Sequence, residues 1–176
     1  DVDGATSAAL LARFCRAAGA SVAVHTPDRI AEGYGPSEIG FRSLADQGAR
    51  LVFCLDCGTT AFEALEAGAA MGLETAVIDH HLAEPRLPRA FAIVNPNRID
   101  EDGALGGLAA VGVTFLLVVA ANRALRQAGW WTEARPEPDL MHWLDLVAVG
   151  AIADLAPLTG VNRALAAQGL RVLGAS

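Results

Sequence analysis

Short apolar segments that predict strands alternate with segments that predict helices, and this alternation constrains the fold more than any other feature of the sequence. Strands are predicted over four segments: Ser21–His25, Leu51–Leu55, Thr75–Ile78 and Phe91–Val94. Helices are predicted over Ala5–Ala18, with Thr6 and Ser7 as capping candidates and Gly19 as its end, from near Pro36, and over Thr59–Met71. Strands that alternate with helices form right-handed crossover units, so a mostly parallel sheet flanked by helices is expected.

The pattern changes after Leu105, beyond which no strand is predicted. Helices are expected over Gly106–Gln127, Asp139–Ala153 and Asn162–Leu173, with breaks at Gly129 and at Pro136 and Pro138. We therefore expect one α/β domain over residues 1–176, with a sheet core over 1–105 and a helical C-terminal segment over 106–176.

Composition excludes some classes of function. The net charge of −7 argues against a nucleic-acid groove, because phosphate binding needs clustered Lys and Arg. Bound divalent cations would offset part of that charge. The three cysteines are an odd number, and the single Cys-x-x-Cys at Cys54 and Cys57 lacks the second pair of a zinc site. Glycines within Ala104–Ala121 argue against a membrane span, and the lack of an export signal before Asp1 predicts a cytoplasmic location.

Acids and histidines fall at or just after the predicted ends of strands. These residues are Asp1, Asp3, Asp56, Asp79, His80 and His81. Parallel strands end at one edge of a sheet, and residues two apart in an extended chain share a face, so Asp1 and Asp3 are expected to point at one site. Carboxylates with imidazole suit Mn²⁺ or Mg²⁺, and two such ions about 3.5 to 4 Å apart form a clamp for phosphoryl displacement. Asp154, inside an apolar run, needs a partner that a metal would supply.

Structural roles are the competing interpretation of the same residues. Asp56 precedes a Gly-Thr-Thr sequence and is suited to cap the next helix, and Asp79 is equally suited to cap or to fix a turn. A single histidine at a strand end is more often a hydrogen-bonded structural residue, but two adjacent histidines after an aspartate are unusual. His25 and His142 lack such company and are expected to be structural.

Four segments, in order and at matching spacing, resemble the motifs of the DHH phosphoesterase family. They are Asp1-Val2-Asp3-Gly4, Asp56-Cys57-Gly58, Asp79-His80-His81, and GAIADLAPL with Asp154. The stretches PDRIAEGYG, VIDHH, AIVNPNR and GAIADLAPLTGVNR are similar to those of RecJ-type exonucleases, rather than to the pyrophosphatases or small-oligonucleotide and cyclic-dinucleotide phosphodiesterases of the superfamily. The resemblance covers nearly the whole chain.

The resemblance implies a role for each matching residue. The metal ligands it implies are Asp1 on one ion, Asp3, His80 and Asp154 on the other, and Asp56 on both. His81 would lie beside the scissile phosphate and would be catalytic together with the bridging carboxylate. Asp79 would orient a histidine without touching the ion. Arg29 would contact the substrate phosphate, with an ordinary solvated arginine as the alternative.

The resemblance also implies the reaction, which is two-metal hydrolysis of single-stranded DNA that releases mononucleotides from the 5′ end, in DNA repair and recombination. The family's first motif begins upstream of Asp1 with a further ligand, and nothing after Asn162 resembles the second, glycine-rich substrate-binding domain. We therefore expect a fragment without that domain, able to hold at most one ion well.

Three alternatives stay open. The first is a DHH phosphodiesterase that acts on short oligonucleotides or cyclic dinucleotides. The second is a non-catalytic DHH-like binding module, which the acidic composition would allow. The third is a Rossmann-like or flavodoxin-like nucleotide binder, against which stands the lack of a G-x-G-x-x-G after a strand.

Overall fold

The computed structural model describes residues 1–175 and divides into two compact units. One unit is Ala23–Gly106, which contains the sheet and is called the α/β unit. The other joins Asp1–Val22 to the residues from Gly107 onward and is called the helical unit. The first helix of the chain thus belongs with the C-terminal helices rather than with the sheet.

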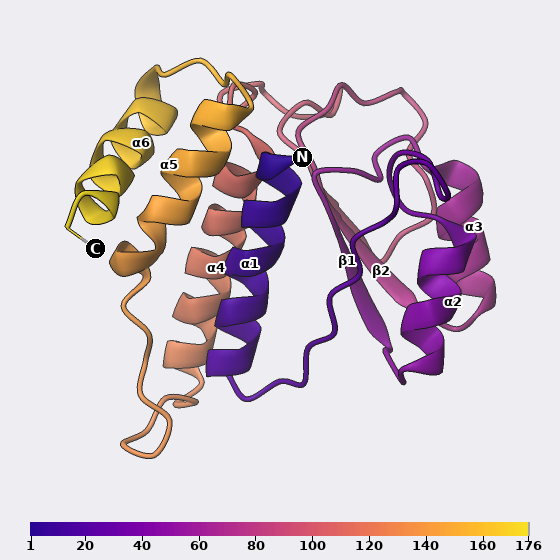
Figure 1. Ribbon diagram of the computed structural model, residues 1–176, viewed down its shortest axis with the longest axis horizontal. Coiled ribbons are helices and arrows are strands. Elements are labelled where there is room, and N and C mark those ends of the chain that lie inside the picture. Colours follow the sequence, from indigo (N-terminus) through magenta and orange to yellow (C-terminus); the bar gives the residue numbers. More distant parts are fainter. Residues whose placement is uncertain (176) are drawn as a thin grey trace. The chain divides into compact units, whose positions relative to one another are not determined.

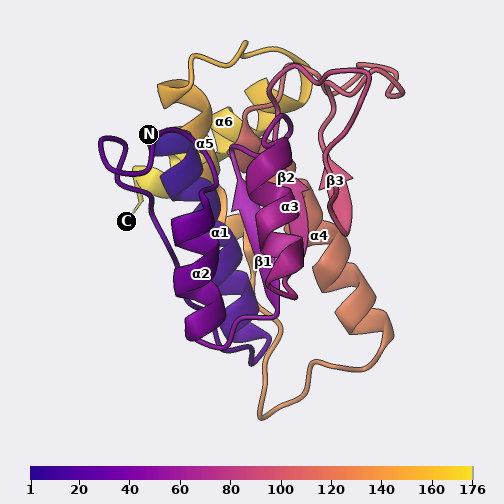
Figure 2. The same cartoon turned by 90° about the vertical axis from the view of Figure 1, so that its right-hand side faces the viewer.

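Three parallel strands form the sheet of the α/β unit, in the order β1-β2-β3 (Figure 1 and Figure 2). Their bounds are Leu51–Leu55 for β1, Glu74–Ile78 for β2 and Ala92–Val94 for β3. In the register Leu55 lies opposite Ile78, and Ile78 lies opposite Val94, so the three strands end at the same level. The residues that follow these strands are therefore brought to one edge of the sheet.

Helices α2 (Glu38–Asp46) and α3 (Phe62–Ala70) complete the α/β unit. Helix α2 begins where the Ser37 hydroxyl accepts a hydrogen bond from the backbone N–H of Gly40 at 2.9 Å. The buried core of this unit joins both helices to the sheet and consists of Phe41, Cys54, Leu65, Leu73 and Val77. Each large apolar side chain buried this fully contributes about 1.5–3 kcal/mol, so the core holds the edge of the sheet in place.

The helical unit contains four α-helices and one short 3-10 helix among the described residues (Figure 1). They are α1 (Val2–Ala17), α4 (Ala110–Gln127), the 3-10 helix Leu140–Trp143, α5 (Leu144–Ala153) and α6 (Gly160–Leu173). Helix α1 packs against α4 and α5, and α5 packs against α6. Within residues 1–175, no helix combines the length and the apolar character needed to cross a bilayer.

The predicted fold class is confirmed by the parallel sheet, its flanking helices and the helical C-terminal segment. The predicted bounds of β1 are those observed, and β2, β3, α2 and α6 begin within two residues of their predicted starts. Helices α3 and α4 begin later than predicted because each is preceded by a turn. In these turns Ala61 N–H donates to the Gly58 carbonyl, and Gly106 N–H donates to the Gly103 carbonyl.

The strand predicted over Ser21–His25 is wrong. The segment has no regular secondary structure and pairs with no strand within residues 1–175. An apolar alternation predicts a strand only where a neighbouring strand supplies the hydrogen bonds, and here the described sheet ends at β1. His25 instead packs on the start of α2, where its ring lies close to Gly40.

The expected extended chain at the first two acids is also wrong. Asp1 is the N-cap of α1, where its carboxylate accepts a hydrogen bond from Gly4 N–H at 2.9 Å, and Asp3 lies in the first helical turn. Residues two apart on a helix point in different directions, so Asp1 is exposed while Asp3 is buried. The capping candidates lie inside the helix: Thr6 donates to the carbonyls of the first turn, and Ser7 is fully buried.

Gly58 is expected to be sensitive to substitution, because it combines a positive φ with close neighbours. It has φ +111°, and an added Cβ would lie 3.2 Å from Cys54 Cβ and from Val77 Cγ2. Gly58→Ala should lower the free energy of unfolding by about 2–4 kcal/mol, because strain in the backbone adds to overpacking. Gly72→Ala is the matched control, since its φ is also positive but no atom lies within 4 Å of the added Cβ. Equal denaturant midpoints for the two variants would contradict the packing argument.

Candidate functional site

Asp56 directly follows β1 and has an unusual backbone conformation. Its φ is +60°, a region that Asp tolerates better than most residues, and its N–H donates to the Ile78 carbonyl of β2 at 3.0 Å. Its side chain does not cap the next helix, because α3 has Ala61 as N-cap with no side-chain hydrogen bond. The capping interpretation of Asp56 is therefore wrong, and its carboxylate, in a residue only 6% exposed, is available for another role.

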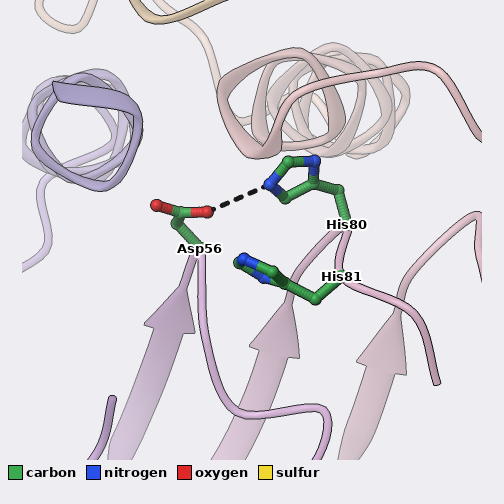
Figure 3. Close-up of side chains that lie close together, drawn as sticks. All are labelled: Asp56, His80 and His81. Atoms are coloured by element: carbon green, nitrogen blue, oxygen red, sulfur yellow. Dashed lines mark ion pairs between the residues drawn. The ribbon is translucent and has the colours of Figure 1, made fainter. Parts of the chain in front are cut away.

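His80 and His81 follow β2 and approach this carboxylate. Figure 3 shows both imidazoles, which follow β2, on the side of the Asp56 carboxylate, which follows the neighbouring strand β1. One ligand atom from each of Asp56, His80 and His81 lies within 4.8 Å of the others. His80 Nε2 is 3.3 Å from Asp56 Oδ1, but this approach lacks hydrogen-bond geometry, and Asp56 Oδ1 accepts no hydrogen bond from the residues that the structure describes.

Asp79 is buried beneath the two histidines and is fully engaged in hydrogen bonds. Its Oδ2 accepts from Thr59 N–H at 3.0 Å, and its Oδ1 accepts from His80 N–H at 2.8 Å and pairs with His81 Nδ1 at 2.7 Å. Burial alone would raise the pKa of Asp79, but hydrogen bonds from His81 and Thr59 hold it below its ordinary value. The ionised carboxylate thus fixes His81 with Nδ1 as donor, which turns Nε2 outward.

Two asparagines after β3 hold the backbone of the histidines. The buried Asn95 side chain donates to the His81 carbonyl at 2.8 Å and to Thr59 Oγ1 at 2.9 Å. The Asn97 side chain donates to the His80 carbonyl at 2.5 Å. The ends of all three strands therefore contribute to the placement of His80 and His81.

Tyr34, from the loop before α2, lies over the same edge. Its hydroxyl is 3.1 Å from the Asp56 carbonyl and 3.3 Å from His81 Nε2. Burial, with a contribution from the negative charge of Asp56, raises the pKa of Tyr34 to about 12, so the hydroxyl stays protonated at neutral pH. The guanidinium carbon of Arg29 lies 5.2 Å from the centre of the Tyr34 ring, which brings one cation to this group of residues.

The other predicted ligands lie in the helical unit. The buried Asp3 carboxylate accepts from Ala110 N–H at 2.7 Å and from Val111 N–H at 2.8 Å, at the start of α4. Asp154 is the C-cap of α5 and is exposed. A carboxylate oxygen of Asp3 lies within 4.8 Å of one from Asp154, and Asp1 caps α1 through its Oδ1. Two like charges at this separation favour a cation between them.

The donor set of the α/β unit fits a divalent cation. A buried carboxylate oxygen with no hydrogen-bond donor carries a desolvation cost that a metal ion would offset. Imidazole and carboxylate ligands without thiolate suit Mn²⁺. Mg²⁺ prefers oxygen ligands, so it is suited by the carboxylates more than by the histidines. Cys54 and Cys57 do not compete as ligands, because burial raises the pKa of both thiols and Cys57 Sγ–H donates to the Leu55 carbonyl.

Tyr34, Thr59 and Asn95 were not predicted as site residues from the sequence. Asn95 immediately follows β3, so the same strand-end argument that selected Asp56 also applies to it. Tyr34 is the only tyrosine of the chain and lies five residues after Arg29 in the same loop. No local pattern indicates that its hydroxyl reaches the end of β1, because the contact spans 22 residues.

Comparison with known proteins places these residues in a family context. The family model described as "DHH family, N-terminal domain" matches residues 1–151. The single-stranded-DNA-specific exonuclease RecJ of Escherichia coli is 40% identical over 172 residues, which are 97% of this chain and 30% of that protein. The protein of the same name from Bacillus subtilis is 37% identical over 98% of this chain and 20% of its own length.

Solved structures show the same fold. A crystal structure of exonuclease RecJ bound to manganese matches with a TM-score of 0.83 and 35% identity, over 100% of this chain and 42% of that chain. RecJ from Thermus thermophilus in complex with Mn²⁺ matches with a TM-score of 0.74 and 32% identity, over 100% of this chain and 24% of that one. The chain therefore spans less than half the length of these relatives.

Proposed function

Because this chain belongs to the DHH family, we propose that it is the metal-binding catalytic part of a phosphodiesterase that degrades single-stranded DNA from the 5′ end. The observation that carries the proposal is the group of Asp56, His80 and His81 at the carboxyl ends of β1 and β2, in which a buried carboxylate oxygen has no hydrogen-bond donor among residues 1–175. Similarity to RecJ proteins supports the choice of substrate.

Mn²⁺ or Mg²⁺ is the proposed cofactor. The ligands that the family motifs imply for it are Asp1, Asp3, Asp56, His80 and Asp154. Two ions are proposed for the full-length protein, with Asp56 as the ligand that they share. When bound, the ions lower the pKa of water and offset the charge that develops on the phosphate.

The side chains around the ligands are proposed to position the substrate. Asp79 accepts a hydrogen bond from His81 Nδ1 and so directs Nε2 toward the place where a phosphate oxygen would lie. Tyr34 keeps a protonated hydroxyl beside the same nitrogen. Arg29, stacked on the Tyr34 ring, supplies a planar cation for a phosphate of the DNA backbone.

Single-stranded DNA is the proposed partner, in DNA repair and recombination, and a cytoplasmic location is part of the same proposal. Selection for single strands would depend on a narrow groove and on surfaces that stack with bases, which a second substrate-binding domain of the full-length protein would supply. The net charge of −7 is compatible with this proposal, since most contacts with DNA phosphates would then be made by the second domain.

Hydrolysis by the full-length protein tests the proposal. After treatment with EDTA the protein should be inactive, and added Mn²⁺ should restore hydrolysis of a single-stranded oligonucleotide but not of a blunt duplex. The protein should be inactive after EDTA because the positioning residues cannot activate water without the metal ion. Mn²⁺ binding without turnover would indicate a non-catalytic binding module. Faster turnover of dinucleotides or cyclic dinucleotides than of long strands would indicate a DHH phosphodiesterase that acts on short oligonucleotides or cyclic dinucleotides.

A further inference from the structure

Glu32 binds three separate points of the loop that precedes α2. Its carboxylate accepts hydrogen bonds from Ser37 Oγ at 2.5 Å and from Asp28 N–H at 3.1 Å, and its Oε2 lies 3.1 Å from His25 Nε2. The Glu32 side chain is only 10% exposed. Hydrogen bonds of this kind, led by the one from Ser37, also hold the pKa of Glu32 below its ordinary value. One ionised carboxylate therefore ties His25, just before the segment 26–37, and Ser37, at its end, to the middle of that segment.

The loop fastened in this way has a defined shape. The Asp28 side chain accepts from the N–H groups of Ile30 and Ala31 at 2.8 and 3.0 Å, and Glu32 N–H donates to the Asp28 carbonyl at 2.7 Å. These bonds close a compact turn around Arg29. Without them a largely exposed loop that contains Gly33 and Gly35 would sample many conformations.

The fastened loop carries the two residues that reach the site. Tyr34 is two residues after Glu32, and its hydroxyl bonds to the Asp56 carbonyl and approaches His81 Nε2. Arg29 stacks on the Tyr34 ring. Glu32 itself has no hydrogen bond or ion pair with Asp56, His80 or His81 in the described structure, so any influence it has on the site passes through the loop.

We propose that Glu32 is a positioning residue for phosphate recognition: it holds the segment 26–37 in the shape that presents Arg29 and Tyr34 beside Asp56 and His81. This inference rests on the proposed function, because it requires Arg29 to contact a DNA phosphate. The competing possibility is that Glu32 only stabilises the fold, since Ser37 also caps α2. In that case the loss of Glu32 would lower the stability of the protein, and its effect would not depend on Arg29.

A double-mutant cycle in the full-length protein separates the two roles. KM and kcat for a single-stranded oligonucleotide with Mn²⁺ are measured for E32A, R29A and the double variant. Each single change should raise KM about tenfold, and the double variant should be no worse than R29A, because residues that act as a unit are not additive. In EDTA, the salt dependence of oligonucleotide binding should become shallower by about one unit in both single variants, as expected for one lost phosphate contact.

Two further variants serve as controls. In E32Q the amide oxygen can still accept the Ser37 hydrogen bond, so E32Q should raise KM less than E32A does. E38Q makes the same chemical change at an exposed helix residue paired with Arg42, and it should match the parent protein. Hydrogen exchange of the metal-free protein should become faster within residues 27–36 in E32A and stay unchanged in E38Q.

The possible outcomes distinguish this inference from the proposed function. Additive effects of E32A and R29A, or an E32A variant that behaves as E38Q does, would overturn the positioning role of Glu32. Hydrolysis that does not depend on Asp56 would overturn the proposed function instead. If hydrolysis depends on Asp56 and E32A only unfolds at a lower denaturant concentration with unchanged KM, Glu32 is a structural residue.

Discussion

Asp56→Asn is expected to abolish hydrolysis in the full-length protein while leaving the fold intact. The variant keeps the size of the side chain, and Asn adopts a φ of +60° at least as readily as Asp does. It loses the negative charge that the proposed metal site requires, so kcat should fall by roughly three orders of magnitude or more. Single-turnover hydrolysis and the denaturant midpoint, measured side by side, test both halves of the prediction.

Two control variants sharpen this test. Asp100→Asn removes the charge of an exposed acid paired with Arg98 and should leave hydrolysis unchanged. Asp56→Ala should be as inactive as Asp56→Asn but also less stable by about 1–2 kcal/mol, because Ala is strained at positive φ. If Asp56→Asn retained near-normal hydrolysis and only unfolded earlier, its carboxylate would be a structural group, and the metal assignment would be wrong.

His80→Ala and His81→Ala are expected to fail in different ways. His80 faces the Asp56 carboxylate at 3.3 Å, with its side chain only 16% exposed, and its loss should weaken Mn²⁺ binding by about tenfold or more. The His81 side chain is 48% exposed, and its ring nitrogens lie beside Asp79 and the Tyr34 hydroxyl. Its loss should reduce kcat by about 10²–10³ at saturating Mn²⁺, because the proposed role of His81 is to contact the phosphate and not to bind the ion.

Mn²⁺ titration followed by electron paramagnetic resonance, combined with kcat at saturating metal, tests this division. His142→Ala is a suitable control, because this exposed histidine lies beside Asp139 in the helical unit. Equal loss of Mn²⁺ by His80→Ala and His81→Ala would show that both histidines are ligands. The group of Asp56, His80 and His81 would then act together on one ion.

The central part of the fold was predictable because its signals are local. A strand buried in a parallel sheet is an apolar run, and Leu51–Leu55 ends at an aspartate that marks the edge of the sheet. The same argument placed Asp79, His80 and His81 at that edge, as observed. Ser21–His25 has a similar local pattern but lacks a partner strand in the described chain, and no local pattern reports a missing neighbour.

Contacts between distant segments could not be predicted from periodicity. Tyr34 reaches Asp56, and Asn95 reaches the carbonyl of His81, only because the strands are already aligned. The N-terminal acids illustrate the same limit. A short Asp-x-Asp sequence is compatible with an extended chain and with a helix start, and the choice is made by Ala110 and Val111, whose N–H groups bind the Asp3 carboxylate.

The division of the chain into two units has a consequence for synthesis. The α/β unit is one continuous run, so its sheet can form as soon as Gly106 is available. Helix α1 is made before the α/β unit but packs against α4 and α5, and Asp3 meets its hydrogen-bond donor 107 residues later. At about 5–20 residues per second, the apolar face of α1 waits roughly 5 to 20 seconds on a growing polypeptide. Helix α1 is therefore made before the α/β unit but is among the last elements of the described chain to find its partners, and until then its apolar face is open to aggregation or chaperone capture.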